Sequence, residues 1–176
     1  ASLTCTQDGH YLAWTIVELA EVDLCTARFE AEFSGGSKGF REKFFRYPTS
    51  LILRYDTVTN TGYVVTGEHR RMTHVIIHPQ DGNTILFCHE GPWELVQRMW
   101  IADVATDKAH PLIETQRHLE RAGHEFFTSS GRIGAQYSYR YRPDMDYLFH
   151  ADVYVNPDGS GEQRYYYPYR RPVHIH

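Results

Sequence analysis

Short runs of alternating apolar and polar residues follow one another along most of the chain. Alternation with a period of two places successive side chains on opposite faces of a β-strand. The clearest runs are YLAWTIV (11–17), LILRYDT (51–57), HVIIHP (74–79), TILFC (84–88), RMWIADV (98–104), RIGAQYSY (132–139) and ADVYV (151–155). The pattern therefore predicts a mostly β protein.

Turn signals separate these runs. Asp-Gly pairs occur at Asp8-Gly9, Asp81-Gly82 and Asp158-Gly159. They favour tight hairpins, because glycine adopts a positive φ without a Cβ clash. Helical character is confined to residues 37–45, which we interpret as part of an insertion, and to the short middle of residues 110–123.

The hairpins repeat in two alternating kinds. Asp56, Asp103 and Asn156 mark the turn of the second kind, at steps of 47 and 53 residues. A period near 50 residues with four strands per unit is typical of a β-propeller blade. We expect blades at residues 1–66, 67–114 and 115–167.

Residues 172–176 would begin a fourth blade. The predicted fold is all-β: one partial β-propeller domain over residues 1–176, with three four-stranded blades, the first strand of a fourth, and an insertion at 18–50 within the first. An unclosed propeller leaves strand edges unpaired. We therefore expect self-association, or further blades that complete the ring.

Histidines fall in register with this repeat. His74, His124 and His174 are separated by steps of 50 residues. Each would lie near the start of the innermost strand of its blade, where side chains face the central channel. His176 follows His174 by two residues and so shares its face of a strand. A lone histidine at a strand start is usually a packing residue, but four in register across three repeats favour a site.

Composition narrows the function classes. The chain has 176 residues, 41% of them hydrophobic, and a net charge of -4 with acidic and basic residues interspersed. This suits one globular domain rather than a nucleic-acid binder, and no apolar run is long enough to span a membrane. The three cysteines Cys5, Cys25 and Cys88 form no CxxC pair. We expect buried thiols in a reducing compartment, hence a cytoplasmic location, with the periplasm as the alternative.

One stretch resembles a known family. HPQDGNTILFCHEGPWELVQRMWIADV (78–104), with its core FCHEGPW and the following RMW, resembles the oligogalacturonate lyases, a family of pectin-degrading polysaccharide lyases. GFREKFFRYPTSLILRYD (39–56), GHEFF (123–127) and the terminal RPVHIH are similar too. The resemblance covers roughly residues 3–176. It implies a seven-bladed propeller, of which this chain holds about half.

The resemblance also implies a chemistry: β-elimination on short galacturonate oligomers, with Mn²⁺ as the usual metal. Imidazole ligands suit several divalent ions, so Zn²⁺ or another ion is the alternative. The C5 carboxylate must be neutralised, a base must take the C5 proton, and the O4 leaving group needs charge relief. Carried over by motif, the metal ligands are His124, His174 and His176. The family has a glutamine where this chain has Arg171. Arginine cannot ligate a metal, because it stays protonated, but it could pair with a substrate carboxylate.

The remaining candidates take other roles. His74 is the predicted catalytic base, because its place in the blade puts it beside the metal histidines, and the role requires a neutral imidazole near pH 7. Arg46 resembles an arginine that binds the substrate carboxylate in this family. His89 and the neighbouring Glu90 either orient the site or stabilise a turn. The substrate-binding candidates are Arg171, Arg98 and Trp93, the last of which either stacks on a sugar ring or packs in the core.

Three alternatives remain open. RRPVHIH, preceded by many tyrosines, also resembles the iron-ligating end of intradiol dioxygenases, although that fold is a sandwich and does not explain the 50-residue register. A non-catalytic propeller could bind uronates or a protein partner through the same channel. The chain could also be a fragment that is active only together with the missing blades.

Overall fold

The computed structural model describes residues 3–17, 49–91, 96–114, 120–139 and 149–167. These residues form three four-stranded antiparallel sheets and no helix. The predicted all-β fold and the division into three blades are confirmed. The possible helix in the middle of 110–123 falls largely on residues 115–119, which lie outside the described residues, and strands flank it on both sides. Within the described part, no helix has the length and apolar character needed to cross a membrane.

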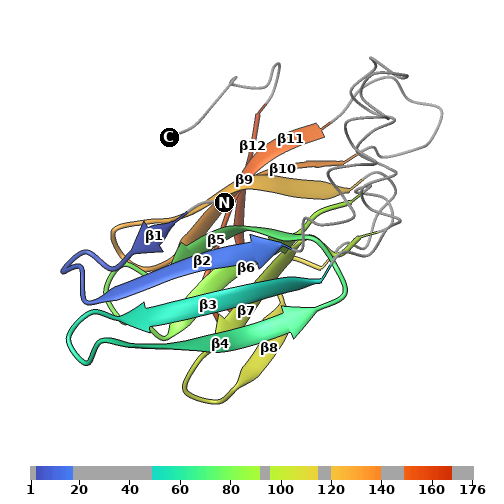
Figure 1. Cartoon of the computed structure of the whole chain (residues 1–176). Helices are drawn as coiled ribbons and strands as arrows, with labels where there is room; N and C mark the ends of the chain where they lie inside the picture. Colours follow the sequence, from blue (N-terminus) through green and yellow to red (C-terminus); the bar gives the residue numbers. More distant parts are fainter. Residues whose placement is uncertain (1–2, 18–48, 92–95, 115–119, 140–148, 168–176) are drawn as a thin grey trace, which may run out of the picture.

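Each sheet is one blade whose strands pair in chain order. The first blade contains β1 (Thr4–Cys5), β2 (Tyr11–Val17), β3 (Ser50–Asp56) and β4 (Thr61–Glu68). The second contains β5 (Met72–Ile77), β6 (Thr84–His89), β7 (Met99–Asp103) and β8 (Lys108–Pro111). The third contains β9 (Arg121–Phe127), β10 (Ile133–Tyr139), β11 (Phe149–Val155) and β12 (Gln163–Tyr166). The first strands of the first two blades, β1 and β5, lie beside each other (Figure 1).

The Asp-Gly turns lie where the sequence predicts them. Gly9, Gly82 and Gly159 all have positive φ, at 72°, 65° and 83°. Gly82 also receives the ring of Tyr11 from the first blade, so a Cβ at this position would collide with that ring. The turn of the second blade is thus packed as well as tight.

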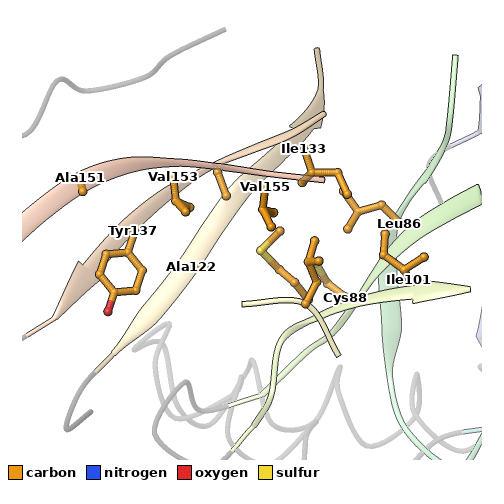
Figure 2. Packing of buried hydrophobic residues seen from close by; sticks show 12 residues of the cluster. Leu86, Cys88, Ile101, Ala122, Ile133, Tyr137, Ala151, Val153 and Val155 are labelled. Carbon is orange, nitrogen blue, oxygen red and sulfur yellow. The ribbon is translucent and has the colours of Figure 1, made fainter. Parts of the chain in front are cut away.

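Two apolar layers hold the blades together. One lies between the first and second blades and is built around Ile52, Val75 and Phe87. The other lies between the second and third blades, where Leu86 and Cys88 of β6 meet side chains of β10 and β11 such as Val155 (Figure 2). Alternation along β6 explains the division, because successive residues of a strand point to opposite faces.

The thiols differ from the expectation in one case. Cys88 is buried as predicted, whereas Cys5, on the short strand β1, is exposed. Cys25 and most of the predicted insertion at 18–50 lie outside the described residues.

Candidate functional site

His74 and His124 occupy equivalent and unusual positions. His74 lies on β5 and His124 on β9, the first strands of adjacent blades. Both have left-handed backbone angles, with φ of 50° and 53°, and both side chains are exposed. At each position the pairing with the next strand shifts register in a β-bulge. Non-glycine residues seldom adopt this conformation, and such strain is concentrated at functional sites.

Two carboxylates flank the imidazole of His74. Its Nδ1 atom lies 3.1 Å from Oε1 of Glu125, which reaches across from the third blade. Its Nε2 atom lies 3.5 Å from Oε1 of Glu90, which follows β6 in the same blade. The His74 side chain is half-exposed, whereas that of Glu125 has no exposed surface. The histidine thus has one face in solvent and one ring nitrogen against a buried acid.

Arg98 joins the same two acids. Its two terminal nitrogens lie 3.2 Å from Oε2 of Glu90 and 3.5 Å from Oε1 of Glu125. Thr73 donates a 2.6 Å hydrogen bond to Glu90, and the thiol of Cys88 donates a 2.9 Å hydrogen bond to Glu125. We call His74, Glu90, Arg98 and Glu125 the inter-blade cluster, since it joins the second and third blades.

The charges of the inter-blade cluster explain its pKa shifts. The hydrogen bond with Glu125 raises the pKa of His74 and outweighs the opposing effect of burial. Burial alone would raise the pKa of Glu125, but the hydrogen bond from His74, the charge of Arg98 and the bond from Cys88 lower that pKa to about 2. Glu125 is therefore ionised at neutral pH. With two carboxylates and one guanidinium nearby, a proton on His74 brings the cluster to zero net charge.

The alternation of side chains between the two faces of β6 determines which residue of FCHEGPW contacts His74. Cys88 points toward the third blade and Phe87 toward the first. Glu90 is two residues beyond Cys88 and contacts His74 and Arg98. A single step along the strand therefore separates the residues of the cluster from those on the opposite face.

His89, a catalytic candidate from the sequence, lies in a different environment. Its side chain is buried against the rings of Phe87 and Trp100, and its Nε2 atom lies 3.3 Å from a carboxylate oxygen of Glu68 in the first blade. Burial lowers the pKa of His89 and so favours the neutral ring. Among the described residues its Nδ1 atom is buried without a hydrogen-bond partner.

The structure brings together His74 and Arg98 and places His124 at the matching position of the next blade. Arg98, predicted to bind substrate, is held by Glu90 and Glu125. Five predicted residues lie outside the described part of the chain: Arg46, Trp93, Arg171, His174 and His176. Within the part that is described, no group of three histidine, cysteine or acidic side chains is placed to hold a metal ion.

Glu125 is the component that sequence reasoning missed. It stands 50 residues after Val75, a buried core residue of the second blade. The signal was present, because the repeat puts an acid where the preceding blade has an apolar side chain. A buried carboxylate is unfavourable unless it is paired. Such a departure from the repeat indicates a partner, but not which one.

The fold and the site define a β-propeller with a histidine and carboxylate cluster at the inner strands of its blades. The β-propeller domain of the trilobed protease from Pyrococcus furiosus has a similar fold, with a TM-score of 0.53 and 12% identity over 93% of this chain and 42% of that one. The family model for oligogalacturonate lyase matches residues 22–157. The chain belongs to the oligogalacturonate lyase family, and the intradiol dioxygenase alternative is set aside.

Individual relatives agree. The chain is 33% identical over 105 residues to the oligogalacturonate lyase of Dickeya dadantii and equally to the oligogalacturonide lyase of Pectobacterium atrosepticum, matches that cover 58% of this chain and 26% of each relative. The structure of an oligogalacturonate lyase in complex with manganese is similar, with a TM-score of 0.74 and 22% sequence identity. The structure of the Vibrio parahaemolyticus oligogalacturonate lyase has a TM-score of 0.72 and 20% sequence identity. Each match covers 93% of this chain and 40% of the solved chain. The chain thus spans about a quarter of its curated relatives.

Proposed function

We propose that the whole protein is a lyase that cleaves short galacturonate oligomers by β-elimination and uses a divalent metal ion, Mn²⁺ in the first instance. Family membership supports the reaction class. The observation that carries the proposal is the equivalent, strained and exposed placement of His74 and His124 on neighbouring inner strands. Two imidazoles at the same edge suit a base beside a metal site.

In this proposal His74 takes the proton from C5 of the uronate. The hydrogen bond with Glu125 raises the pKa of His74, which makes the neutral imidazole a stronger base. Arg98 balances the charge of the two acids behind the imidazole. Arg46 and Arg171 would bind substrate carboxylates, since a guanidinium matches a carboxylate with two parallel hydrogen bonds.

The donor set fits a divalent metal ion. The exposed imidazole of His124 is the ligand that the described residues contribute, and His174 and His176 would supply the others. When bound, such an ion draws charge from the C5 carboxylate and so makes the neighbouring proton more acidic. Arg171 would then contribute charge to substrate binding rather than a bond to the metal.

Ultraviolet absorbance of the unsaturated uronate product tests the proposal. We expect Mn²⁺-dependent product from oligogalacturonate, and none from His74→Asn. Asparagine is the suitable replacement, because it tolerates the left-handed backbone better than alanine does. Metal analysis of His124→Asn is expected to show reduced Mn²⁺ content with the fold retained by circular dichroism. Product formation that persists in His74→Asn would refute the role of His74.

A second candidate is a propeller that binds uronates without turnover. The observation that favours it is Arg171 at the position where the family has a glutamine ligand. Calorimetric titration with galacturonate oligomers separates the two functions. Binding without any unsaturated product, with or without Mn²⁺, would favour the binding module.

A further inference from the structure

The third blade buries a carboxylate at a position where the second blade buries a valine. Val75 and Glu125 are 50 residues apart, and both are buried on the first strand of their blades. A carboxylate is costly there, since it leaves water for a largely apolar layer. An apolar residue would pack the two blades together at least as well. Packing alone therefore does not account for Glu125.

We propose that Glu125 is a positioning residue for His74: it holds the proton of the neutral imidazole on Nδ1 and so leaves Nε2 as the atom that accepts a proton. This inference rests on the proposed function for its catalytic consequence. The tautomer itself is inferred from the contacts of the two ring nitrogens. Glu125 acts through His74 and does not contact the substrate in this proposal.

The distances at the two ring nitrogens of His74 favour a proton on Nδ1. Nδ1 lies 3.1 Å from Glu125, within ordinary hydrogen-bond range, whereas Nε2 lies 3.5 Å from Glu90. Glu90 also receives the short hydrogen bond from Thr73 and the closer of the two contacts from Arg98. The carboxylate at Nδ1 is thus the better acceptor for the single ring proton, and the hydrogen bond made by one nitrogen sets the role of the other.

The buried surroundings of Glu125 keep it in place. Its side chain has no exposed surface, and Arg98 and the thiol of Cys88 contact the same oxygen that faces His74. A carboxylate fixed in this way orients the ring as well as its proton. Since the acid comes from the third blade and the histidine from the second, stacking of the blades assembles the pair.

Nitrogen NMR of histidine-labelled protein tests the tautomer directly. The metal-free protein is measured well above the imidazole pKa, and the His74 signals are assigned by their loss in His74→Asn. Two variants are compared, Glu125→Met and Glu125→Gln. Both remove the charge, but only glutamine keeps an oxygen acceptor for the Nδ1 proton.

We expect Nδ1–H in the unaltered protein and in Glu125→Gln, and a shift toward Nε2–H in Glu125→Met. In the lyase assay, Glu125→Met should lower kcat on the order of 10²-fold with little change in KM, and Glu125→Gln should restore part of the loss. Nε2–H in the unaltered protein, or Nδ1–H retained in a folded Glu125→Met, would overturn the inference. If Glu125→Met does not fold, the unaltered protein and Glu125→Gln still decide.

The two proposals fail separately. A protein with Nδ1–H on His74 but no lyase activity would refute the proposed function and leave the positioning contact standing. An active enzyme with Nε2–H on His74 would refute the positioning role of Glu125 and leave the proposed function standing.

Discussion

His74 and His124 lie 50 residues apart in the chain and share the same left-handed backbone conformation, at the same bulge of adjacent blades. Strand geometry alone does not require this, since most strand residues have negative φ. The bulge directs each side chain out of the sheet at the inner edge. The repeat therefore reproduces a backbone irregularity as well as a residue type.

The strain at this position predicts an order of stability among His74 variants. His74→Asn and His74→Val both remove the imidazole, and valine is the less suited of the two to the left-handed backbone at this position. We expect His74→Val to be less stable than His74→Asn by about 1–2 kcal/mol, because a β-branched residue is poorly suited to positive φ. Urea unfolding of both variants measures this difference. Equal stabilities would show that the bulge relaxes when the histidine is removed.

The raised pKa of His74 predicts the pH dependence of the enzyme. If neutral His74 is the base, kcat/KM should rise with pH through a midpoint above 6.5, the usual value for histidine. Glu125→Gln keeps a hydrogen-bond acceptor for the ring but removes the carboxylate charge that favours the protonated imidazole, so it should move that midpoint to lower pH. NMR titration of the His74 ring in metal-free protein gives the same pKa without turnover. A midpoint unchanged by Glu125→Gln would contradict the assignment.

The same shift contributes to stability with a defined sign. A histidine whose pKa is raised by folding stabilises the fold below its unfolded pKa, and this contribution is lost as the pH rises through the folded pKa. His74 is half-exposed, so solvent weakens the effect. We therefore expect the titration of His74 to be visible in the pH dependence of kcat/KM rather than in the pH dependence of the free energy of unfolding.

Sequence pattern predicted the blades well, because their signals are local. The alternating run at 11–17 is β2 in full, and Asp-Gly pairs mark turns with positive φ. The cluster around His74 was harder to predict because its contacts cross between blades. Glu125 and His74 are 51 residues apart, and no local pattern states which side chains meet there.

Alternation along the strand distinguishes His89 from Glu90 within the FCHEGPW motif. His89 was selected from it as a catalytic candidate, yet Glu90 is the residue that contacts His74. Cys88 and Glu90 differ by two positions and so share a face, which His89 does not. The role of Arg98 depended on distances that only the folded chain provides, since it contacts acids of two different blades.

Glu125 predicts an acid-labile contribution to stability. Its pKa is lowered from 4.5 to about 2 in the fold, so its contribution is present above pH 4.5 and lost as the pH falls toward 2. The loss amounts to about 3 kcal/mol across that range. Glu125→Gln, which cannot titrate, should lose correspondingly less stability over the same range. Urea unfolding at several pH values measures both slopes, and parallel curves for the two proteins would contradict the pairing.

Gly82 and Gly9 offer a matched test of how the first two blades pack. Both glycines lie in Asp-Gly turns with positive φ, so alanine at either position should cost about 1–2 kcal/mol for the backbone alone. A Cβ at Gly9 would meet nothing within 4 Å, whereas one at Gly82 would collide with the ring of Tyr11. That ring cannot move away freely, because the guanidinium of Arg54 lies 3.6 Å above it. We therefore expect Gly82→Ala to cost a further ~1–3 kcal/mol, measured by urea unfolding. Equal losses of unfolding free energy in the two variants would show that the Tyr11 ring moves aside at no energetic cost. The turn would then not fix the contact between these blades.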